Sequence, residues 1–521
     1  MKETLRAALG FIAALVLLPA PARGDQWFTQ TLLHVPGIPK TVLVTDLDGD
    51  GRPDLAAVYA VSFPTRLAFQ SHLAAFLQTP AGFPAEPDAT ATLERGESAI
   101  FLAEIDASHP GPDLALLRPG GLSAWSVVHE GGKARWTEKD LGATGSAWMG
   151  ADWSGVRAID LARDLDGDGR DEIVVPARDG VGILAAGPDG RYAMTQTLHA
   201  SLFREMGQPE DPGAILDYFD RYSVKLSETF PEIHAVDLDA DKRLDLVLTY
   251  AGTTASYRQG PDGRFATSPR LFRAGGAPNV DLMRAAVPPK LVTIQPRDFD
   301  GDGRADLLFS RCEVRGLKGI ITVDLYRNVN GIFETKPSFH LRQEVLALFP
   351  FVTDFDRDGK LDFTFLQTEF GLKQIINFFL TRRVTFHYDF YLWRGAPAFT
   401  PKPVKRKGIS VKFDLREAHL SAFPTSDVTQ DFNGDGVPDF YAVRERNAFA
   451  VYFGKPDKDD LFSGDPDIEV KVHQSFYHRF ADLNGDRRAD VIYWYQSETI
   501  RKDLADKILV LTSPLPVLRA R

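Results

Sequence analysis

The sequence predicts an all-β fold: a β-propeller of four-stranded blades with two partly helical insertions, for which eight blades are favoured and seven remain possible. Three observations predict it. An acidic nine-residue motif recurs along the 521 residues, a strand-like apolar run follows each copy, and successive copies begin roughly 50 to 77 residues apart. An interval of that length accommodates four short strands. Radial four-stranded sheets also let a chain of this size form one domain, here residues 23–521.

The clearest copy of the motif is Asp-Leu-Asp-Gly-Asp-Gly-Arg-Pro-Asp at residues 46–54, followed by the apolar run 55–58. Six further copies keep acidic or amide residues at positions one, three, five and nine. Positions one, three, five, seven and nine are Asp46, Asp48, Asp50, Arg52, Asp54; Asp164, Asp166, Asp168, Arg170, Glu172; Asp237, Asp239, Asp241, Arg243, Asp245; Asp298, Asp300, Asp302, Arg304, Asp306; Asp354, Asp356, Asp358, Lys360, Asp362; Asp431, Asn433, Asp435, Val437, Asp439; and Asp482, Asn484, Asp486, Arg488, Asp490. A degenerate eighth copy is expected at 104–116, and whether it binds metal is left open.

This spacing predicts about seven calcium sites. In a tight loop, side chains at positions one, three and five can turn inward on one centre, while glycine at position four or six permits the positive φ that sharp turning needs. Position seven varies from arginine to valine, so we expect it to contribute its backbone carbonyl. The carboxylate at position nine would close the ligand shell. Magnesium is less favoured because it demands near-ideal octahedral geometry and keeps its waters.

Acidic loops of this kind have two other interpretations. An EF-hand requires a bidentate glutamate at position twelve, but that position holds apolar or aromatic residues here: Ala57, Val175, Leu248, Phe309, Phe365, Ala442 and Tyr493. Alternatively, aspartate and glycine merely form good turns. Seven copies that all retain the carboxylate at position nine argue against that second interpretation.

The ends of the chain predict how the ring closes. Strands are expected at 491–495 and 508–512, after which the chain ends before a fourth strand of the last blade. The segment 27–34 has no loop of its own and is expected to supply that outer strand.

The N-terminus predicts a signal peptide at residues 1–22. Lys2 and Arg6 precede an apolar run at 7–18, and a small-residue stretch follows with cleavage expected near 22–24. The run is too short and lacks the flanks of an integral membrane span. We therefore expect a secreted or periplasmic protein. The single cysteine, Cys312, excludes an intramolecular disulfide, and we expect it to be a buried, inert thiol.

The repeated Asp-x-Asp-Gly-Asp-Gly-x-x-Asp pattern, with its following apolar strand, resembles the FG-GAP/VCBS repeat family, which also forms integrin α-subunit propellers. Partial family signatures occur at Phe453-Gly454 and at 275–278. The resemblance implies an exported, bacterial-type, calcium-binding propeller. It leaves function open, because the family includes adhesion proteins, lectins and polysaccharide lyases.

Two insertions interrupt the regular spacing, near 202–231 and 371–421. The first has apolar residues on one predicted helical face: Ile215, Phe219, Tyr222 and Leu226. The second begins with a helical pattern at Leu372, Ile375, Ile376 and Phe379, continues as a strand at 384–390, and contains the basic residues Lys402, Lys405, Arg406, Lys407 and Lys412. We favour apolar faces that pack on the propeller and a solvated basic loop over a partner-binding patch.

Composition and motifs favour a non-catalytic binding or scaffold protein with an unidentified protein or glycan partner. The balance of 71 Asp plus Glu against 60 Lys plus Arg argues against nucleic acid as the partner. Zinc, nucleophile-elbow, phosphate-loop and dinucleotide motifs are all missing from the sequence. The alternative is a calcium-dependent carbohydrate-active enzyme, such as a polysaccharide lyase on a propeller scaffold. Identical pockets repeated around the ring would favour a lectin, and one unique cleft would favour an enzyme.

Overall fold

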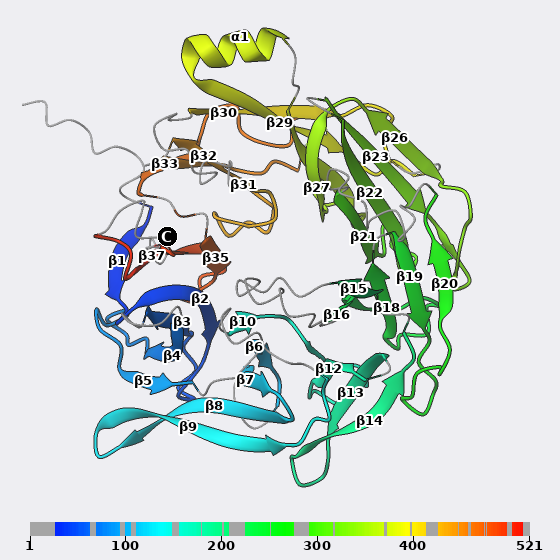
Figure 1. Cartoon of the computed structure of the whole chain (residues 1–521). Helices are drawn as coiled ribbons and strands as arrows, with labels where there is room; N and C mark the ends of the chain where they lie inside the picture. Colours follow the sequence, from blue (N-terminus) through cyan, green and yellow to red (C-terminus); the bar gives the residue numbers. More distant parts are fainter. Residues whose placement is uncertain are drawn as a thin grey trace, which may run out of the picture.

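Eight sheets of four or five strands radiate from a central axis in the computed structural model (Figure 1). The structure describes residues 27–513 except 63–68, 94–98, 106–110, 148–155, 179, 201–202, 208–224, 251, 276–290, 316–317, 369–371, 396–398, 413–425, 446–447, 457–459, 474, 476 and 497–502. This arrangement confirms the predicted all-β propeller and its eight blades.

Blades 1 to 4 follow one another along the first half of the chain, each ordered from its innermost strand outward. They comprise β2 (Ile38–Thr45), β3 (Asp54–Ser62), β4 (Phe69–Phe76) and β5 (Ala89–Thr92); β6 (Ala99–Ala103), β7 (Asp113–Arg118), β8 (Gly121–Glu130) and β9 (Lys133–Gly142), with β10 (Arg157–Ala158) added parallel to β6; β11 (Ala162–Arg163), β12 (Glu172–Ala177), β13 (Gly180–Ala186) and β14 (Tyr192–Leu198); and β17 (Glu232–Val236), β18 (Asp245–Tyr250), β19 (Thr253–Tyr257) and β20 (Arg270–Arg273).

Blades 5 to 8 complete the ring in the same inner-to-outer order. They comprise β21 (Leu291–Arg297), β22 (Asp306–Arg315), β23 (Lys318–Tyr326) and β26 (Phe339–Gln343), with the small hairpin of β24 (Asn328–Val329) and β25 (Ile332–Phe333) between the last two; β27 (Leu346–Thr353), β28 (Asp362–Thr368), β29 (Arg383–Tyr391) and β30 (Lys405–Lys412); β31 (Ser426–Asp427), β32 (Phe440–Glu445), β33 (Ala448–Tyr452) and β34 (Ile468–Lys471); and β35 (Tyr477–Ala481), β36 (Asp490–Trp494), β37 (Lys507–Thr512) and β1 (Thr29–His34).

The two ends of the described chain meet in blade 8. Strand β1 pairs antiparallel with β37 over its full length, with Thr29 opposite Thr512 and His34 opposite Lys507. The outermost strand of the last blade therefore comes from the beginning of the chain, as predicted. Leu33 of β1 is fully buried in a cluster that also contains residues of blade 1, so this pairing joins the first and last blades.

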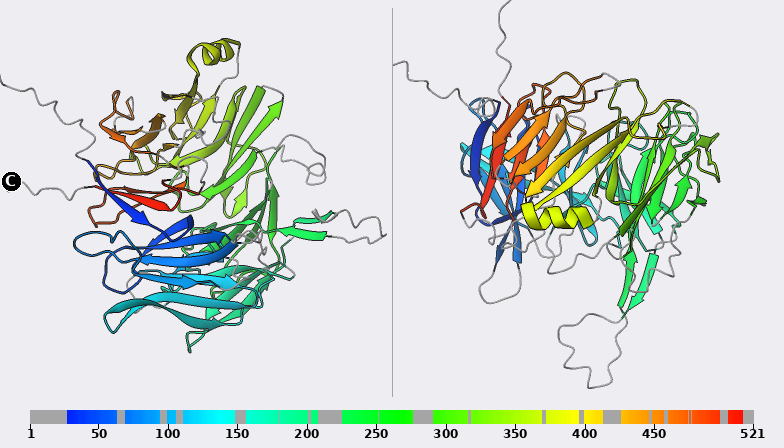
Figure 2. Two further views of the ribbon diagram at one scale, coloured as in Figure 1. Left: turned by 60° about the vertical axis from the view of Figure 1, so that its left-hand side comes forward. Right: turned by 90° about the horizontal axis from the view of Figure 1, so that it is seen from above.

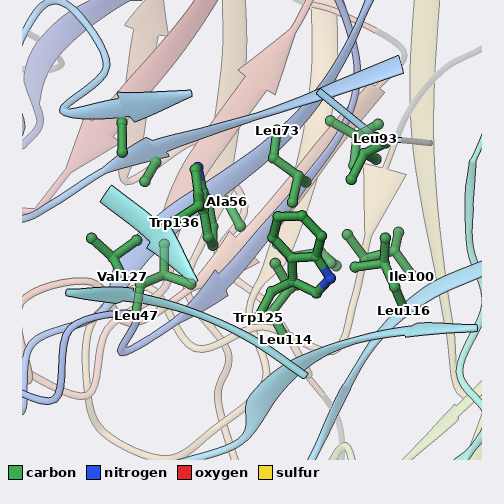
Figure 3. Close-up of a cluster of buried hydrophobic side chains, with 14 of the residues drawn as sticks. Leu47, Ala56, Leu73, Leu93, Ile100, Leu114, Leu116, Trp125, Val127 and Trp136 are labelled. Carbon is green, nitrogen blue, oxygen red and sulfur yellow. The ribbon is translucent and has the colours of Figure 1, made fainter. Parts of the chain in front are cut away.

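Neighbouring blades are held together by side chains from the faces of their sheets. The cluster between blades 1 and 2 combines Ala56 and Leu73 with Leu114, Trp125 and other residues of the second blade (Figure 3). Alternation along each strand sends one set of side chains into each neighbouring interface. For this reason the middle strands of the blades are apolar on both faces, and their sequences do not alternate between apolar and polar residues.

A repeated amide contact adds polar links between blades. After the third strand of blades 1, 4 and 5 stands Gln78, Gln259 or Asn328, whose side-chain amide donates to a backbone carbonyl of the preceding blade. The acceptors are the position-two residues Leu483, Leu165 and Leu238, at 2.9, 2.7 and 2.8 Å. The first of these bonds spans the closure of the ring.

The described part of the first insertion is a hairpin of β15 (Phe203–Gly207) and β16 (Lys225–Thr229). Leu226 lies in a strand, so the helical expectation is wrong at this residue. Ile215, Phe219 and Tyr222 lie outside the described residues. The hairpin stands out from one face of the ring (Figure 2).

The second insertion contains α1 (Leu372–Thr381), followed directly by β29. The helix lies outside the ring, beyond the edge of blade 6 (Figure 1). Its apolar side chains do not all pack on the propeller, because Phe379 is 73% exposed and Leu380 is 79% exposed. The basic residues Lys405 and Lys412 bound β30, so the segment expected to be a loop is a strand.

Cys312 is buried in β22 and unbonded to another cysteine, as expected, and burial raises the pKa of its thiol. The predicted signal peptide lies outside the described residues. Among the residues that are described, no helix has the length and apolar character that crossing a membrane requires.

Ring closure through β1 generates a stability prediction. Truncation of the fully buried Leu33 to alanine should lower the free energy of unfolding by about 2–5 kcal/mol, because it leaves a cavity between blades 8 and 1. Its neighbour Leu32 is 46% exposed, and Leu32→Ala should change the free energy by less than about 0.5 kcal/mol. Urea unfolding of both variants checks this, and equal effects would contradict the closure.

Candidate metal centres in the blade loops

Each acidic loop connects the first and second strands of a blade and is organised around its position-one carboxylate. In blade 1, Asp46 accepts backbone N–H bonds from Gly49 at 2.8 Å and Gly51 at 2.7 Å. Both glycines have positive φ, at 79° and 84°. The same backbone shape is kept in blade 4, where Ala240 and Lys242 take φ values of 63° and 70° at these positions. The loop geometry therefore persists even where it strains residues other than glycine.

Five loops bring at least three carboxylates together, with one oxygen of each within 4.8 Å of the others. The five groups are Asp46, Asp48, Asp50; Asp164, Asp166, Glu172; Asp237, Asp239, Asp241; Asp298, Asp300, Asp302; and Asp354, Asp356, Asp362. Position nine belongs to two of these groups and position five to three. Hard oxygen donors gathered in this way could hold a metal ion.

The loops of blades 7 and 8 have an asparagine at position three. Asn433 donates from its side-chain amide to Asp435 at 3.1 Å, and Asn484 donates to Asp486 at 3.3 Å. The side-chain carbonyl of each asparagine accepts the backbone N–H of the same aspartate, at 2.8 and 3.0 Å. In these two loops an amide thus already relieves part of the repulsion between carboxylates.

The position-nine carboxylate has a structural role that the sequence pattern did not reveal. In blade 6, Asp362 is fully buried and accepts the backbone N–H of Phe355 at 3.0 Å and of Trp393 at 2.7 Å. One bond holds the loop and the other holds the end of the third strand. The same pair of bonds is made by Asp54, Asp245, Asp439 and Asp490.

Burial raises the pKa of every position-nine carboxyl. The pKa rises to about 6 for Asp54, about 7 for Glu172 and about 8 for Asp362, with desolvation as the largest cause. The backbone N–H bonds act in the opposite direction and the neighbouring loop aspartates add to the rise. A cation in the loop would favour the charged form of each group.

In four loops the side chain at position seven forms an ion pair with the aspartate at position five. The guanidinium of Arg170 lies 3.1 Å from Asp168, and that of Arg304 lies 3.2 Å from Asp302. Arg52 and Arg243 make the equivalent ion pairs with the position-five aspartates of blades 1 and 4. The arginine at position seven thus neutralises position five, whereas Val437 of blade 7 is buried and apolar.

A second set of arginines reaches position three from the end of the third strand. Arg258 contacts Asp239 at 2.6 Å in blade 4, and Arg394 contacts Asp356 at 2.9 Å in blade 6. In blade 5, Arg327 pairs with Asp300. These partners are separated by 19, 38 and 27 residues respectively, so no fixed sequence spacing could have identified them.

Three loop carboxylates nevertheless keep a buried oxygen with no hydrogen-bond partner: Oδ1 of Asp239, Oδ2 of Asp306 and Oδ1 of Asp356. The side chain of Asp356 is wholly inaccessible to solvent. Leaving a buried carboxylate oxygen unsatisfied is costly. The donor set and these oxygens therefore fit a hard cation.

The degenerate loop of blade 2 is only partly described, because residues 106–110 lie outside the described set. The backbone N–H of Glu104 donates to the carboxylate of Asp171 in blade 3 at 2.8 Å, and Asp171 N–H donates back to the Glu104 carbonyl. The remnant of this loop thus links blade 2 to blade 3.

Two interblade grooves open beside these loops. One, of about 480 Å³, lies between blades 4 and 5 and is lined by Leu238, Arg258 and Arg270 among others. The other, of about 390 Å³, occupies the equivalent place between blades 3 and 4. Its charged lining residues are Asp166, Glu172, Asp262 and a single arginine, Arg264. The grooves correspond in position but differ in charge.

The bonds of position nine predict a difference between two aspartates of one loop. Asp362→Ala should lower the free energy of unfolding by about 2–5 kcal/mol with or without calcium, because two buried N–H groups lose their acceptor. Asp358→Ala removes an exposed carboxylate that accepts the backbone N–H of Lys360, so its larger effect should appear when calcium is present. Urea unfolding in EDTA and in millimolar calcium separates the two variants. If Asp362→Ala lowered the free energy of unfolding only in calcium, the structural role would be contradicted.

The raised pKa values also predict a pH dependence. A carboxyl whose folded pKa exceeds its unfolded value stabilises the fold at low pH, and this contribution is lost as pH rises through the folded pKa. For Asp54, Glu172 and Asp362 that window extends from about 4 to about 8. The melting temperature in EDTA should therefore be lower at pH 8 than at pH 5, and calcium should narrow the gap. A melting temperature in EDTA that rises with pH would contradict this.

The family model for FG-GAP-like repeats matches residues 237–309, 298–364 and 431–493. Each matched stretch begins at position one of a loop and ends just beyond the following loop. No curated protein matches the chain. A solved structure of an Agrocybe aegerita lectin, described by its specific recognition of non-reducing terminal N-acetylglucosamine, is 17% identical with a TM-score of 0.40, covering 83% of this chain and 92% of that one.

A solved structure of a protein from Lactobacillus plantarum is 11% identical with a TM-score of 0.31, covering 86% of this chain and 97% of that one. Likenesses this distant carry no argument about ligands. The matched repeats and the eight radial sheets agree with each other: the chain is a β-propeller that contains FG-GAP-like repeats.

Proposed function

We propose that this chain is an exported, calcium-stabilised propeller that acts as a non-catalytic binding or scaffold module for a protein or glycan partner. The observation that supports calcium most directly is the buried, unpartnered Oδ1 of Asp356 beside Asp354 and Asp362. A divalent cation of oxygen-preferring chemistry would satisfy that atom and offset the repulsion among the three carboxylates.

Calcium would be held by positions one, three and five of the seven loops, with the carbonyl of position seven and, where it reaches, the carboxylate of position nine. Bound there, the ion supplies positive charge that holds the loop carboxylates together. Arg52, Arg170, Arg243 and Arg304 supply part of that charge from the protein itself. The ion's role is therefore structural, and in a protein whose one cysteine is free it does what disulfides do in other exported proteins.

A binding role is supported by the two interblade grooves. Equivalent pockets with identical linings would favour a lectin that repeats one sugar site around the ring. Instead, Arg258 and Arg270 line one groove where Asp166 and Glu172 line the other. This difference in charge favours a partner that contacts several unlike surfaces, such as a protein or a heterogeneous glycan. It disfavours a ring of identical monosaccharide sites.

The structural role of calcium predicts a stability gain on adding the ion. At one to ten times its dissociation constant, each bound ion contributes about 0.4–1.4 kcal/mol, so seven sites together give about 3–10 kcal/mol. For a ring of roughly 490 residues this raises the melting temperature by about 3–10 °C. Thermal unfolding of the mature chain in EDTA and in millimolar calcium measures the shift.

Native mass spectrometry of the same samples counts the bound ions, and about seven are expected. Magnesium at equal concentration is the control and should give a smaller shift, because it sheds its waters reluctantly. An unchanged melting temperature with no bound calcium would mean that the acidic loops are only turns, and the calcium proposal would then be wrong.

A further inference from the structure

The helix α1 presents large apolar side chains to solvent on one face. Ile376, Phe379 and Leu380, which share this face at spacings of three and four residues, are 50%, 73% and 79% exposed. Phe378, one residue away, is half-buried, and the helix contacts β29. The helix therefore lies beyond the edge of blade 6 (Figures 1 and 2), and the face formed by Ile376, Phe379 and Leu380 is open to solvent.

The end of α1 is held in a defined shape. The backbone N–H of Arg382 donates to the carbonyl of Phe378 at 2.7 Å, and Arg382 has a φ of 55°. A left-handed residue at this place ends the helix and turns the chain sharply into β29. Two arginines, Arg382 and Arg383, consequently stand next to the exposed apolar turn, and Arg383 lies opposite Lys412 in the β29–β30 register.

The surroundings of α1 are cationic in an acidic protein. Residues 372–388 and 408–412, which form α1 and the adjoining half of the β29–β30 hairpin, contain four Lys plus Arg and no Asp or Glu, which gives +4, whereas the whole chain has a formal charge of −11. The basic residues toward the other end of the hairpin contact the propeller: Arg394 pairs with Asp356, Lys405 with Asp460 and Arg406 with Asp389, and Lys407 donates to the Ser463 carbonyl. The four basic residues near α1 are Lys373, Arg382, Arg383 and Lys412, which lie in the helix or at the hairpin end that joins it.

We propose that α1 docks on an anionic lipid surface, with Ile376, Phe379 and Leu380 entering the interface and the flanking basic residues contacting headgroup phosphates. A short helix with an apolar face and cationic flanks has the character of an interfacial membrane helix. A soluble polyanion would match the cations but leave the apolar face in water. A second copy of the chain would cover the apolar face but bring like charges together.

The test is co-sedimentation of the full mature chain with vesicles of equal parts phosphatidylglycerol and phosphatidylcholine, and with pure phosphatidylcholine vesicles. Binding should be at least about tenfold tighter to the anionic vesicles. The double variant Phe379→Ser/Leu380→Ser should weaken binding by at least about tenfold, and Arg382→Gln/Arg383→Gln should weaken it by about tenfold.

Leu271→Ser, at an apolar residue that is 63% exposed on β20, is the matched control and should leave binding unchanged. The melting temperature of each variant shows that it is folded. As a second readout, Phe379→Trp should be quenched by lipids brominated in their acyl chains. Vesicle binding that these variants leave unaltered, or sedimentation as an α1-dependent dimer without lipid, would overturn the proposal.

Discussion

The fold depends on a buried carboxylate that is shared between two backbone segments of a blade, an arrangement that the described residues show in five of the eight blades. Asp362 illustrates it: one oxygen accepts an N–H from the loop after the first strand, and the other accepts an N–H at the end of the third. Because the second strand begins at this residue, one side chain fixes the relative position of three strands. The contact recurs in blades 1, 4, 7 and 8 with the same partners in the repeat. Amide side chains such as Gln78 extend this connection to the preceding blade.

The remaining loop carboxylates create a repulsion that the protein relieves in two ways. Arginine at position seven, exemplified by Arg170, pairs with position five, and arginines such as Arg394 pair with position three from a distant strand end. Asp356 shows why arginine alone is insufficient, since one of its oxygens is paired and the other is buried without a partner. A metal ion in the loop would act on the oxygen that Arg394 does not contact, so the two cations would satisfy different oxygens of the same carboxylate.

The sequence was sufficient to predict whatever depends on local spacing. The recurring motif located all seven acidic loops, and the apolar position twelve correctly excluded an EF-hand. The segment 27–34, which has no acidic loop of its own, correctly predicted the closing strand. Contacts between distant segments were not predictable. Arg327 meets Asp300 only because β23 returns to the loop, and strand length varies between blades. The structural role of position nine was not predictable for a different reason: a carboxylate repeated in all seven copies suits a metal ligand and an acceptor of backbone N–H bonds equally well.

The distribution of charge separates two surfaces of the molecule. Residues 372–388 and 408–412, in and beside α1, carry a charge of +4, so the total of −11 leaves −15 on the rest of the chain. The acidic loops all connect first to second strands, so they lie at corresponding places around the ring, whereas α1 lies outside it beyond blade 6 (Figure 1). An anionic surface would be repelled by most of the propeller and attracted to this one extension. Placing Phe379 and Leu380 there, away from the carboxylates, lets a single blade engage such a surface while the others remain in solution.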